Sequence, residues 1–212
     1  MSVEPPAILT HLFSTTLLRR DLDEVDGSTL RNCKLIALLF AGSWCIPSRQ
    51  FVQILSEAYT EINGEFGAGT MEVVLVPREE GQSQWHNFFG SMPWLSLKFG
   101  DPYIGKLKSH FSIVRIPVLP VLDGRGAVVS ANARGGSGFG FCCDAVNAFA
   151  ALIRQSGQDL PLPVKSRTSS RANGSGGSSE GSSDDDDDDD EDEDDEDGEG
   201  SAGGLADEDG VR

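Results

Sequence analysis

Cys45 is the residue whose sequence context most clearly indicates a reactive side chain. A continuous apolar run over residues 35–41 leads up to it, and apolar side chains at helical spacing follow it over residues 51–62. The cysteine therefore lies at a predicted strand-to-helix junction, with Pro47 near the first helical turn, where a missing N–H costs little. A helix N-terminus carries partial positive charge and unpaired N–H groups, so it favours a thiolate. This arrangement is typical of a redox-active cysteine.

Ser48 stands where a dithiol reductase would carry its second cysteine, three residues after the first. In such an enzyme one thiolate attacks the target disulfide, and the second cysteine then releases the mixed disulfide. With Ser48 the attack stays possible, but the release needs an external thiol. The Ser48 hydroxyl could donate a hydrogen bond to the thiolate and keep Cys45 reactive. Two interpretations stay open, a reactive monothiol and a degenerate, non-catalytic site.

The other three cysteines offer no clear partner for Cys45. Cys33 precedes the apolar strand, whose length at about 3.3 Å per residue should separate the two thiols, and we interpret it as a small buried hydrophobe. Cys142 and Cys143 are adjacent, and adjacent cysteines bond to each other only with strain. We expect one to be packed and the other partly exposed. No cysteine pair or histidine spacing predicts a metal site.

Apolar periodicity predicts an α/β sandwich with a mixed sheet. The expected elements are a short helix near residues 8–13, short elements at 15–18 and 25–30, strands at 35–41 and 71–76, helices at 47–65, 82–91 and 103–111, a hairpin of strands at 118–122 and 127–131, and a last helix at 141–155. We divide the chain into an N-terminal extension (1–14), a globular domain (15–160), a Ser/Gly-rich linker (161–183) and a disordered acidic tail (184–212).

The formal charge of -17 belongs to the tail and not to the predicted domain. Residues 166–212 hold 19 acidic and 3 basic side chains, while residues 1–165 hold 15 acidic and 14 basic ones. Such a tail is either a solvated disordered segment or a segment that binds basic proteins, and it should repel nucleic acid. Ser182 and Ser183 precede the acidic run and resemble phosphorylation sites of acidophilic kinases.

The N-terminus lacks the basic and apolar regions of a signal peptide, and no apolar run reaches the roughly 18–20 residues of a membrane span. We therefore expect a cytoplasmic or nuclear protein with no membrane partner.

Four blocks resemble the tryparedoxin and nucleoredoxin branch of the thioredoxin-like superfamily. The segment Ser43-Trp44-Cys45-Ile46-Pro47-Ser48-Arg49 resembles the S-W-C-P-P-C-R motif of that branch. The other three blocks are Glu72–Leu75 followed by Glu79-Glu80, the M-P-W-L motif in Ser91–Leu95, and the H-F-x-V-x-x-I-P-T-L block at His110–Leu119. They match in order over about residues 15–155. The resemblance implies a thioredoxin-like fold, a central mixed sheet flanked by helices.

The resemblance also implies roles for individual residues. Cys45 matches the attacking cysteine, Trp44 the tryptophan that shields and packs the site, and Pro47 the proline between the two cysteines. Pro117 matches a proline that is cis in the family and faces the active cysteine, where the preceding backbone can pair with substrate. We expect the same placement here.

Three positions depart from the family pattern. Ser48 replaces the resolving cysteine, Ile46 replaces the first proline, and Arg78 replaces the tryptophan of a W-D-E segment. The chain thus resembles a redox protein whose motif W-C-P-P-C has become W-C-I-P-S.

Two functional hypotheses follow. The first is a monothiol thiol–disulfide exchange protein in cell redox homeostasis, in which Cys45 forms mixed disulfides with protein partners of the peroxiredoxin type. A low-molecular-weight thiol of the trypanothione or glutathione type would then be the reductant. The second is a redox-inactive interaction module whose acidic tail binds basic proteins.

Overall fold

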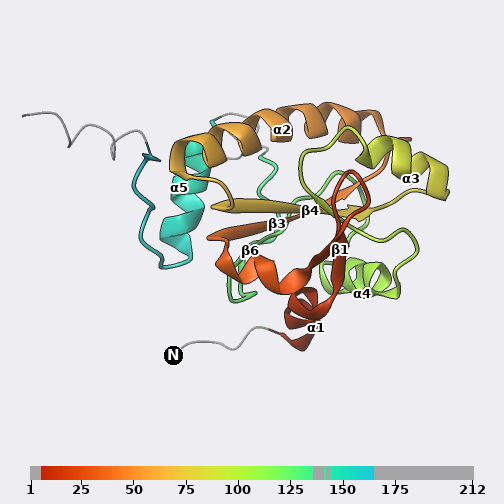
Figure 1. Cartoon of the computed structure of the whole chain (residues 1–212), viewed down its shortest axis with the longest axis horizontal. Helices are drawn as coiled ribbons and strands as arrows, with labels where there is room; N and C mark the ends of the chain where they lie inside the picture. The colour runs from red at the N-terminus through yellow and green to blue at the C-terminus, as the bar shows by residue number, and fades with distance from the viewer. Residues whose placement is uncertain (1–5, 136–140, 142–143, 165–212) are drawn as a thin grey trace, which may run out of the picture. The chain divides into compact units, whose positions relative to one another are not determined.

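The computed structural model describes residues 6–135, 141 and 144–164 (Figure 1). Its centre is a seven-stranded sheet with the order β2-β1-β5-β4-β3-β6-β7. The strands are β1 (Thr16–Leu18), β2 (Glu24–Asp26), β3 (Leu35–Ala41), β4 (Met71–Pro77), β5 (Leu95–Leu97), β6 (Val121–Asp123) and β7 (Val128–Ser130). β3, β4 and β5 run parallel, while β1 pairs with β5 and β6 pairs with β3 in antiparallel fashion. The sheet is therefore mixed, as predicted.

Helices cover both faces of this sheet. They are α1 (Ala7–Thr10), α2 (Ile46–Phe66), α3 (Gln82–Phe89), α4 (Pro102–His110) and α5 (Ala145–Gln155), with 3₁₀ helices η1 (His11–Ser14) and η2 (Gly27–Asn32). α2 lies on one side of the sheet, and α1 and α4 lie on the other (Figure 1). The two apolar clusters follow this division, one containing residues of α2, α3 and α5 and the other residues of α1, η1 and α4. The thioredoxin-like arrangement predicted from the sequence is thus present.

β3 is the strand on which the candidate site is built. All seven of its residues are buried, because helices cover both of its faces and β4 and β6 flank its edges. This explains why its sequence, Leu35–Ala41, is continuously apolar rather than alternating. Its seven residues pair with the seven of β4 in register from Leu35–Met71 to Ala41–Pro77. The position directly after β3 is consequently held by a rigid element.

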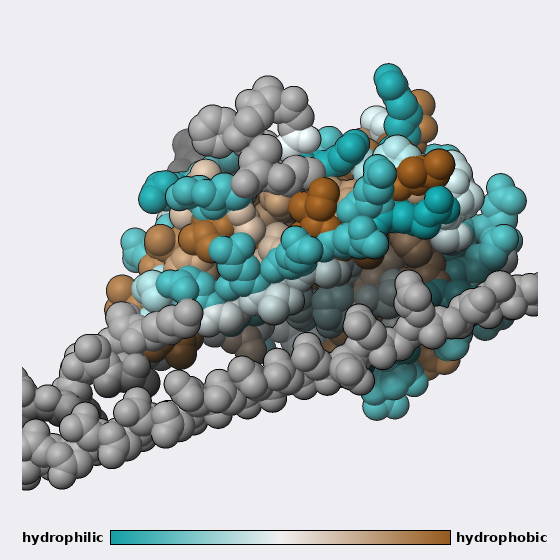
Figure 2. All heavy atoms as spheres, turned by 90° about the horizontal axis from the view of Figure 1, so that it is seen from above, coloured by the Kyte–Doolittle hydropathy of each residue, from teal (hydrophilic) through white to brown (hydrophobic). Residues whose placement is uncertain are grey.

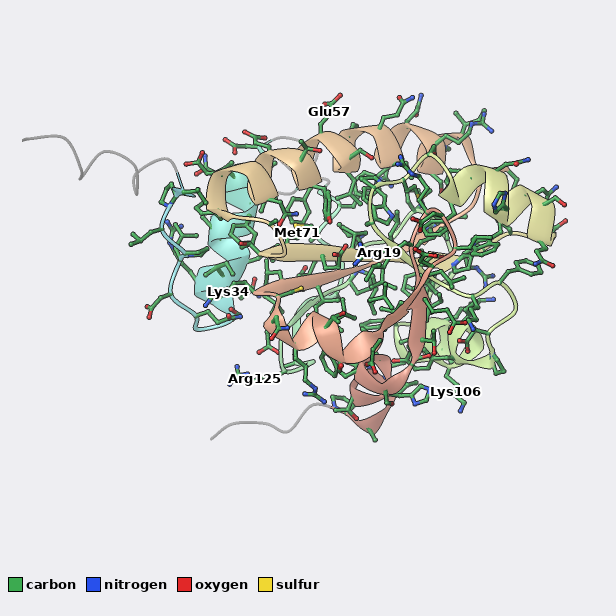
Figure 3. All side chains as sticks on the ribbon, in the orientation of Figure 1. Arg19, Lys34, Glu57, Met71, Lys106 and Arg125 are labelled. Carbon is green, nitrogen blue, oxygen red and sulfur yellow. The ribbon has the colours of Figure 1, made fainter. Side chains whose placement is uncertain are left out.

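α2 carries the chain back along β3 from the site. Its inward residues join the sheet core, while Arg49, Glu57 and Glu61 are exposed, and Glu57 points away from the sheet whereas Met71 lies beneath the helix (Figure 3). Seen from above this helix, the surface is mostly hydrophilic with separate apolar patches (Figure 2). At its C-terminal end the Asn63 amide donates to the Met71 carbonyl at 2.9 Å and accepts from the Met71 N–H at 3.1 Å. These bonds fix the helix against β4.

Two expectations differ from the observed fold. The predicted elements did not include β5, which follows the motif at Ser91–Leu95 and lies between β1 and β4 in the sheet. Residues 1–14 were expected to be an extension, but Leu9, Leu12 and Phe13 are buried in the core that faces α4. The folded domain therefore begins before residue 15.

Much of the expected C-terminal organisation lies outside the described residues. This applies to most of the linker, to the acidic tail with Ser182 and Ser183, and to Cys142 and Cys143. In the described part, no helix is both long and apolar enough to cross a membrane.

Candidate active site

Cys45 is the N-cap residue of α2, four residues after the end of β3. Its N–H donates to the Gly42 carbonyl at 3.1 Å, and its own carbonyl accepts from the N–H of Ser48 at 3.0 Å and of Arg49 at 3.2 Å. Pro47 lies in the first turn of the helix, as predicted. The Cys45 side chain is half-buried, makes no capping hydrogen bond and is not part of a disulfide.

The loop before Cys45 is held by side chains on both sides. The Ser43 N–H and hydroxyl both donate to the Glu79 carboxylate, the hydroxyl at 3.0 Å. The Arg49 guanidinium donates to the Ser43 carbonyl at 2.6 Å. Hydrogen bonds to charged groups are stronger than neutral ones, so these contacts restrain the loop. Sequence reasoning had placed Glu79 in a family block without giving it this role.

Trp44 is an exposed side chain held in one orientation. The residue is 60% exposed, and its Nε1–H donates to the Arg78 carbonyl at 2.8 Å. A Cβ atom on Gly42 would lie 2.8 Å from this Nε1 and 3.2 Å from the Arg78 oxygen. Only glycine therefore allows the indole to lie across the loop in this way.

Pro117 brings a second segment to the cysteine. The peptide bond between Ile116 and Pro117 is cis, which is the geometry that the resemblance implied. The Cys45 thiol donates a hydrogen bond to the Ile116 carbonyl, with 3.5 Å between the sulfur and the oxygen. Pro117 is buried, whereas Ile116 is half-buried at the edge of the site. Residues 71 positions apart in the sequence are thus joined at the reacting sulfur.

Ser48 points into the protein and away from hydrogen-bond partners in the described part of the chain. Its side chain is fully buried, and its hydroxyl has no hydrogen-bond partner among the described residues. The hydrogen bond that Ser48 could have donated to the Cys45 sulfur is therefore not formed. A buried hydroxyl without a partner costs about 1–3 kcal/mol, so this position is not optimised for serine.

A cavity of about 290 Å³ opens next to the sulfur and is called the Cys45 pocket below. Its lining residues are Trp44, Cys45, Arg78, Lys108, Ile113, Val114, Arg115 and Ile116. Three of them are cationic and none is a carboxylate. Of the three, only Arg78 stood out in the sequence. Lys108 and Arg115 lie far from Cys45 along the chain; Lys108 lies outside the family blocks, and Arg115 occupies an unspecified position of the block at His110–Leu119.

A second cavity, of about 370 Å³, shares Trp44 and Arg78 with the Cys45 pocket but not the cysteine. Its lining includes the acidic residues Glu79, Glu80 and Asp101. Trp44 and Arg78 thus line both a basic cavity and one that contains carboxylates.

Cys33 is more deeply buried than Cys45. It is buried before the start of β3, and burial, followed by the negative charge of Glu72, raises the pKa of its thiol to about 12. The prediction of a small buried hydrophobe is consistent with this placement. Burial also raises the pKa of Glu72 to about 7, although the Val73 N–H, the Tyr59 hydroxyl and the Arg19 charge act in the other direction. Within the described residues, no group of histidine, cysteine and carboxylate side chains could hold a metal ion.

Comparison with known proteins identifies related sequences. Residues 32–128 match a family model described as thioredoxin-like. Tryparedoxin of Trypanosoma brucei brucei is 35% identical over 123 residues, which are 57% of this chain and 82% of that protein. Probable nucleoredoxin 1 of Arabidopsis thaliana is 30% identical over 138 residues, or 62% of this chain, but the match spans only 24% of that longer protein.

Solved structures give the same result. A tryparedoxin from Trypanosoma brucei has a TM-score of 0.54 and 33% identity, with 60% of this chain and 88% of that one covered. A thioredoxin from Wuchereria bancrofti has a TM-score of 0.54 and 32% identity, with 58% and 85% covered.

Proposed function

Because the chain belongs to the thioredoxin-like family, in the branch of the tryparedoxins and nucleoredoxins, we propose that it exchanges thiols and disulfides through Cys45 alone. The family carries out thiol–disulfide redox chemistry. The observation that supports a single working thiol is the position of Cys45, half-exposed at the N-terminus of α2 and 3.5 Å from the Ile116 carbonyl oxygen. In this position the sulfur lines an open pocket, so a partner disulfide can reach it.

The first step is nucleophilic displacement at sulfur. The Cys45 thiolate attacks one sulfur of a partner disulfide, a new S–S bond forms, and the old S–S bond breaks. The other partner sulfur leaves with the electron pair as a thiolate and takes up a proton from water. Cys45 and the retained sulfur are then joined in a mixed disulfide, so no further oxidant is consumed.

Release of the partner needs a thiol from outside the described residues. Ser48 cannot attack as a thiolate, and Cys33 lies buried at the far end of β3 with a raised pKa. We propose a low-molecular-weight thiol of the glutathione or trypanothione type, whose thiolate attacks the mixed disulfide and becomes disulfide-bonded to the Cys45 sulfur or to the partner. A second molecule of the same thiol completes the reduction. Protein thiols and disulfides of the peroxiredoxin type are the proposed partners.

The decisive experiment compares the wild type with Cys45→Ser and Ser48→Cys. A model protein disulfide is incubated with each chain, and adducts are measured by non-reducing electrophoresis and intact mass. We expect the wild type to accumulate a reducible adduct, Cys45→Ser to form at least about tenfold less, and Ser48→Cys to release the partner and form an internal disulfide. Ser48→Cys also removes the buried hydroxyl that has no partner, so the variant should fold.

Equal adducts from the wild type and Cys45→Ser would contradict the proposal. That outcome would favour the alternative, a redox-inactive interaction module whose acidic tail binds basic proteins. Deleting residues 184–212 and measuring binding to a basic protein at physiological salt would then test that alternative.

A further inference from the structure

We propose that the Cys45 pocket recognises polypeptide partners whose reacting cysteine is flanked by acidic residues. The inference rests on the proposed function, because it names the class of partner for the same thiol. It follows from the charges and the exposed apolar side chains around the sulfur. Of the residues that supply them, only Trp44 and Ile46 belong to the active-site motif.

The charge of the pocket is uncompensated. Arg78, Lys108 and Arg115 line it together with Cys45, and its lining contains no carboxylate. The ion pairs in the described part of the chain are Lys98–Glu24 and Arg125–Asp123, so none of these three cations has an acidic partner there. Their side chains also make no hydrogen bond within the same residues. Three cations are thus available to a ligand.

The three cations come from separate segments of the fold. Arg78 follows β4 and is half-buried, Lys108 is exposed in the last turn of α4, and Arg115 is exposed next to Ile116. Their common position results from the tertiary structure. Because all three cations line the pocket that contains the sulfur, acidic side chains next to a partner cysteine would meet positive charge there.

Exposed apolar side chains indicate that the occupant is a polypeptide rather than a small anion. Trp44 is 60% exposed, Ile46 is 59% exposed and Val114 is 92% exposed. Trp44 and Val114 line the pocket, and Ile46 follows the cysteine directly in the sequence. Large apolar side chains grouped at one place on a surface mark sites of protein contact. An anion alone would leave them in water.

Charge complementarity acts mainly on the rate at which partners meet. Complementary fields raise association rates, and salt weakens them because the Debye length falls from about 10 Å at 0.1 M to about 3 Å at 1 M. The neighbouring cavity, which carries Glu79, Glu80 and Asp101, would repel an acidic segment. Acidic flanks should therefore direct a partner toward the cysteine side of Trp44.

The test uses the full chain and three cysteine peptides activated as mixed disulfides with the neutral leaving group 2-thiopyridine. The peptides differ only in the residues beside the cysteine, which are aspartate, glutamine or lysine. The second-order rate constant is followed by release of 2-thiopyridone at low and high salt. We expect the aspartate peptide to react about tenfold faster than the lysine peptide at 0.05 M salt, and within about twofold of it at 1 M.

Matched variants assign the effect to the pocket. Lys108→Gln combined with Arg115→Gln should reduce the aspartate-to-lysine ratio from about tenfold to about twofold. Lys106→Gln is the control, because Lys106 is exposed on the same helix, does not line the pocket and points away from the sheet (Figure 3). It should keep the wild-type ratio.

The outcomes separate this inference from the function on which it rests. If all three peptides react equally fast, or if the preference does not change with salt, the inference is overturned while the monothiol function stands. The same holds if Lys106→Gln lowers the ratio as much as the pocket variant. If no peptide reacts with Cys45, the proposed function itself fails.

Discussion

A cysteine lies near each end of β3, and the two cysteines have different environments. Cys33, just before the strand, is buried, and burial together with the charge of Glu72 raises its pKa to about 12. Cys45, just after the strand, is half-exposed at a helix N-terminus and lines a pocket with three cations. The same side chain is thus a packing residue at one end and a candidate nucleophile at the other.

The difference arises from what meets each end of the strand. At the Cys33 end, Glu72 in β4 and Tyr59 in α2 form a hydrogen bond of 3.3 Å, and burial raises the pKa of both groups. At the Cys45 end, the start of α2 and the unpaired cations provide positive potential. A thiolate is therefore disfavoured at Cys33, whereas an anionic partner segment would meet positive charge beside Cys45.

The largest expected effect is a difference in alkylation rate between these two cysteines. With iodoacetamide at pH 7.5, Cys45 should react at least about 100-fold faster than Cys33, because a thiol with a pKa of about 12 is almost never ionised at that pH and is also shielded. Quenched samples, peptide mapping and mass spectrometry give the rate for each cysteine separately.

A denatured sample is the control, since unfolding removes both environments and the two rates should converge. Rates for Cys33 and Cys45 within about threefold of each other in the folded protein would show that the two ends are not differentiated.

β3 and α2 were predictable from the sequence because their patterns are local. The continuous apolar run over residues 35–41 gave the boundaries of β3, and the helical spacing after Cys45 gave α2 to within one residue at each end. A central strand buried on both faces and a long amphipathic helix have the strongest patterns. β5, with only three residues, was missed because it is held by its pairing with β1 and β4.

The chemistry around Cys45 depends on tertiary contacts and was only partly predictable. Lys108 and Arg115 carry no signal of their own and reach the site through the packing of α4 and the segment before Pro117. The hydrogen bond that Ser48 could have donated to the Cys45 sulfur is not formed. Ser48 is directed into the protein, while the Cys45 thiol contacts the Ile116 carbonyl.

A smaller effect is expected from Glu72→Gln, which changes the other end of β3. In the folded protein the pKa of Glu72 is raised to about 7, compared with 4.5 for an ordinary glutamate. Between these values the folded state binds more protons than the unfolded state, so this group makes the free energy of unfolding fall as pH rises. Glutamine does not ionise. The variant should therefore be more stable than the wild type at pH 8, by on the order of 2–3 kcal/mol, and nearly equal to it at pH 4.

Urea unfolding at both pH values measures this change, with Glu57→Gln as a control because Glu57 is exposed on α2 (Figure 3). The pKa of Cys33 should also decrease in Glu72→Gln, since the charge of Glu72 helps to raise it. A variant that is less stable than the wild type at pH 8 would mean that the carboxylate contributes more through its bonds to Tyr59 and Val73 than its burial costs.

The smallest effect is expected from Trp44→Phe, at the Cys45 end. The variant loses the 2.8 Å hydrogen bond from Nε1 to the Arg78 carbonyl but keeps an aromatic ring. Because the residue is 60% exposed and the carbonyl can bind water instead, the free energy of unfolding should fall by no more than about 1 kcal/mol. Urea unfolding measures that loss, and the alkylation rate of Cys45 should stay within about threefold of the wild-type rate. A loss of stability above about 2 kcal/mol would show that the Cys45 end depends on Trp44 for its structure, as the Cys33 end depends on its buried core. The contrast between a packed end and a reactive end of β3 would then be weaker.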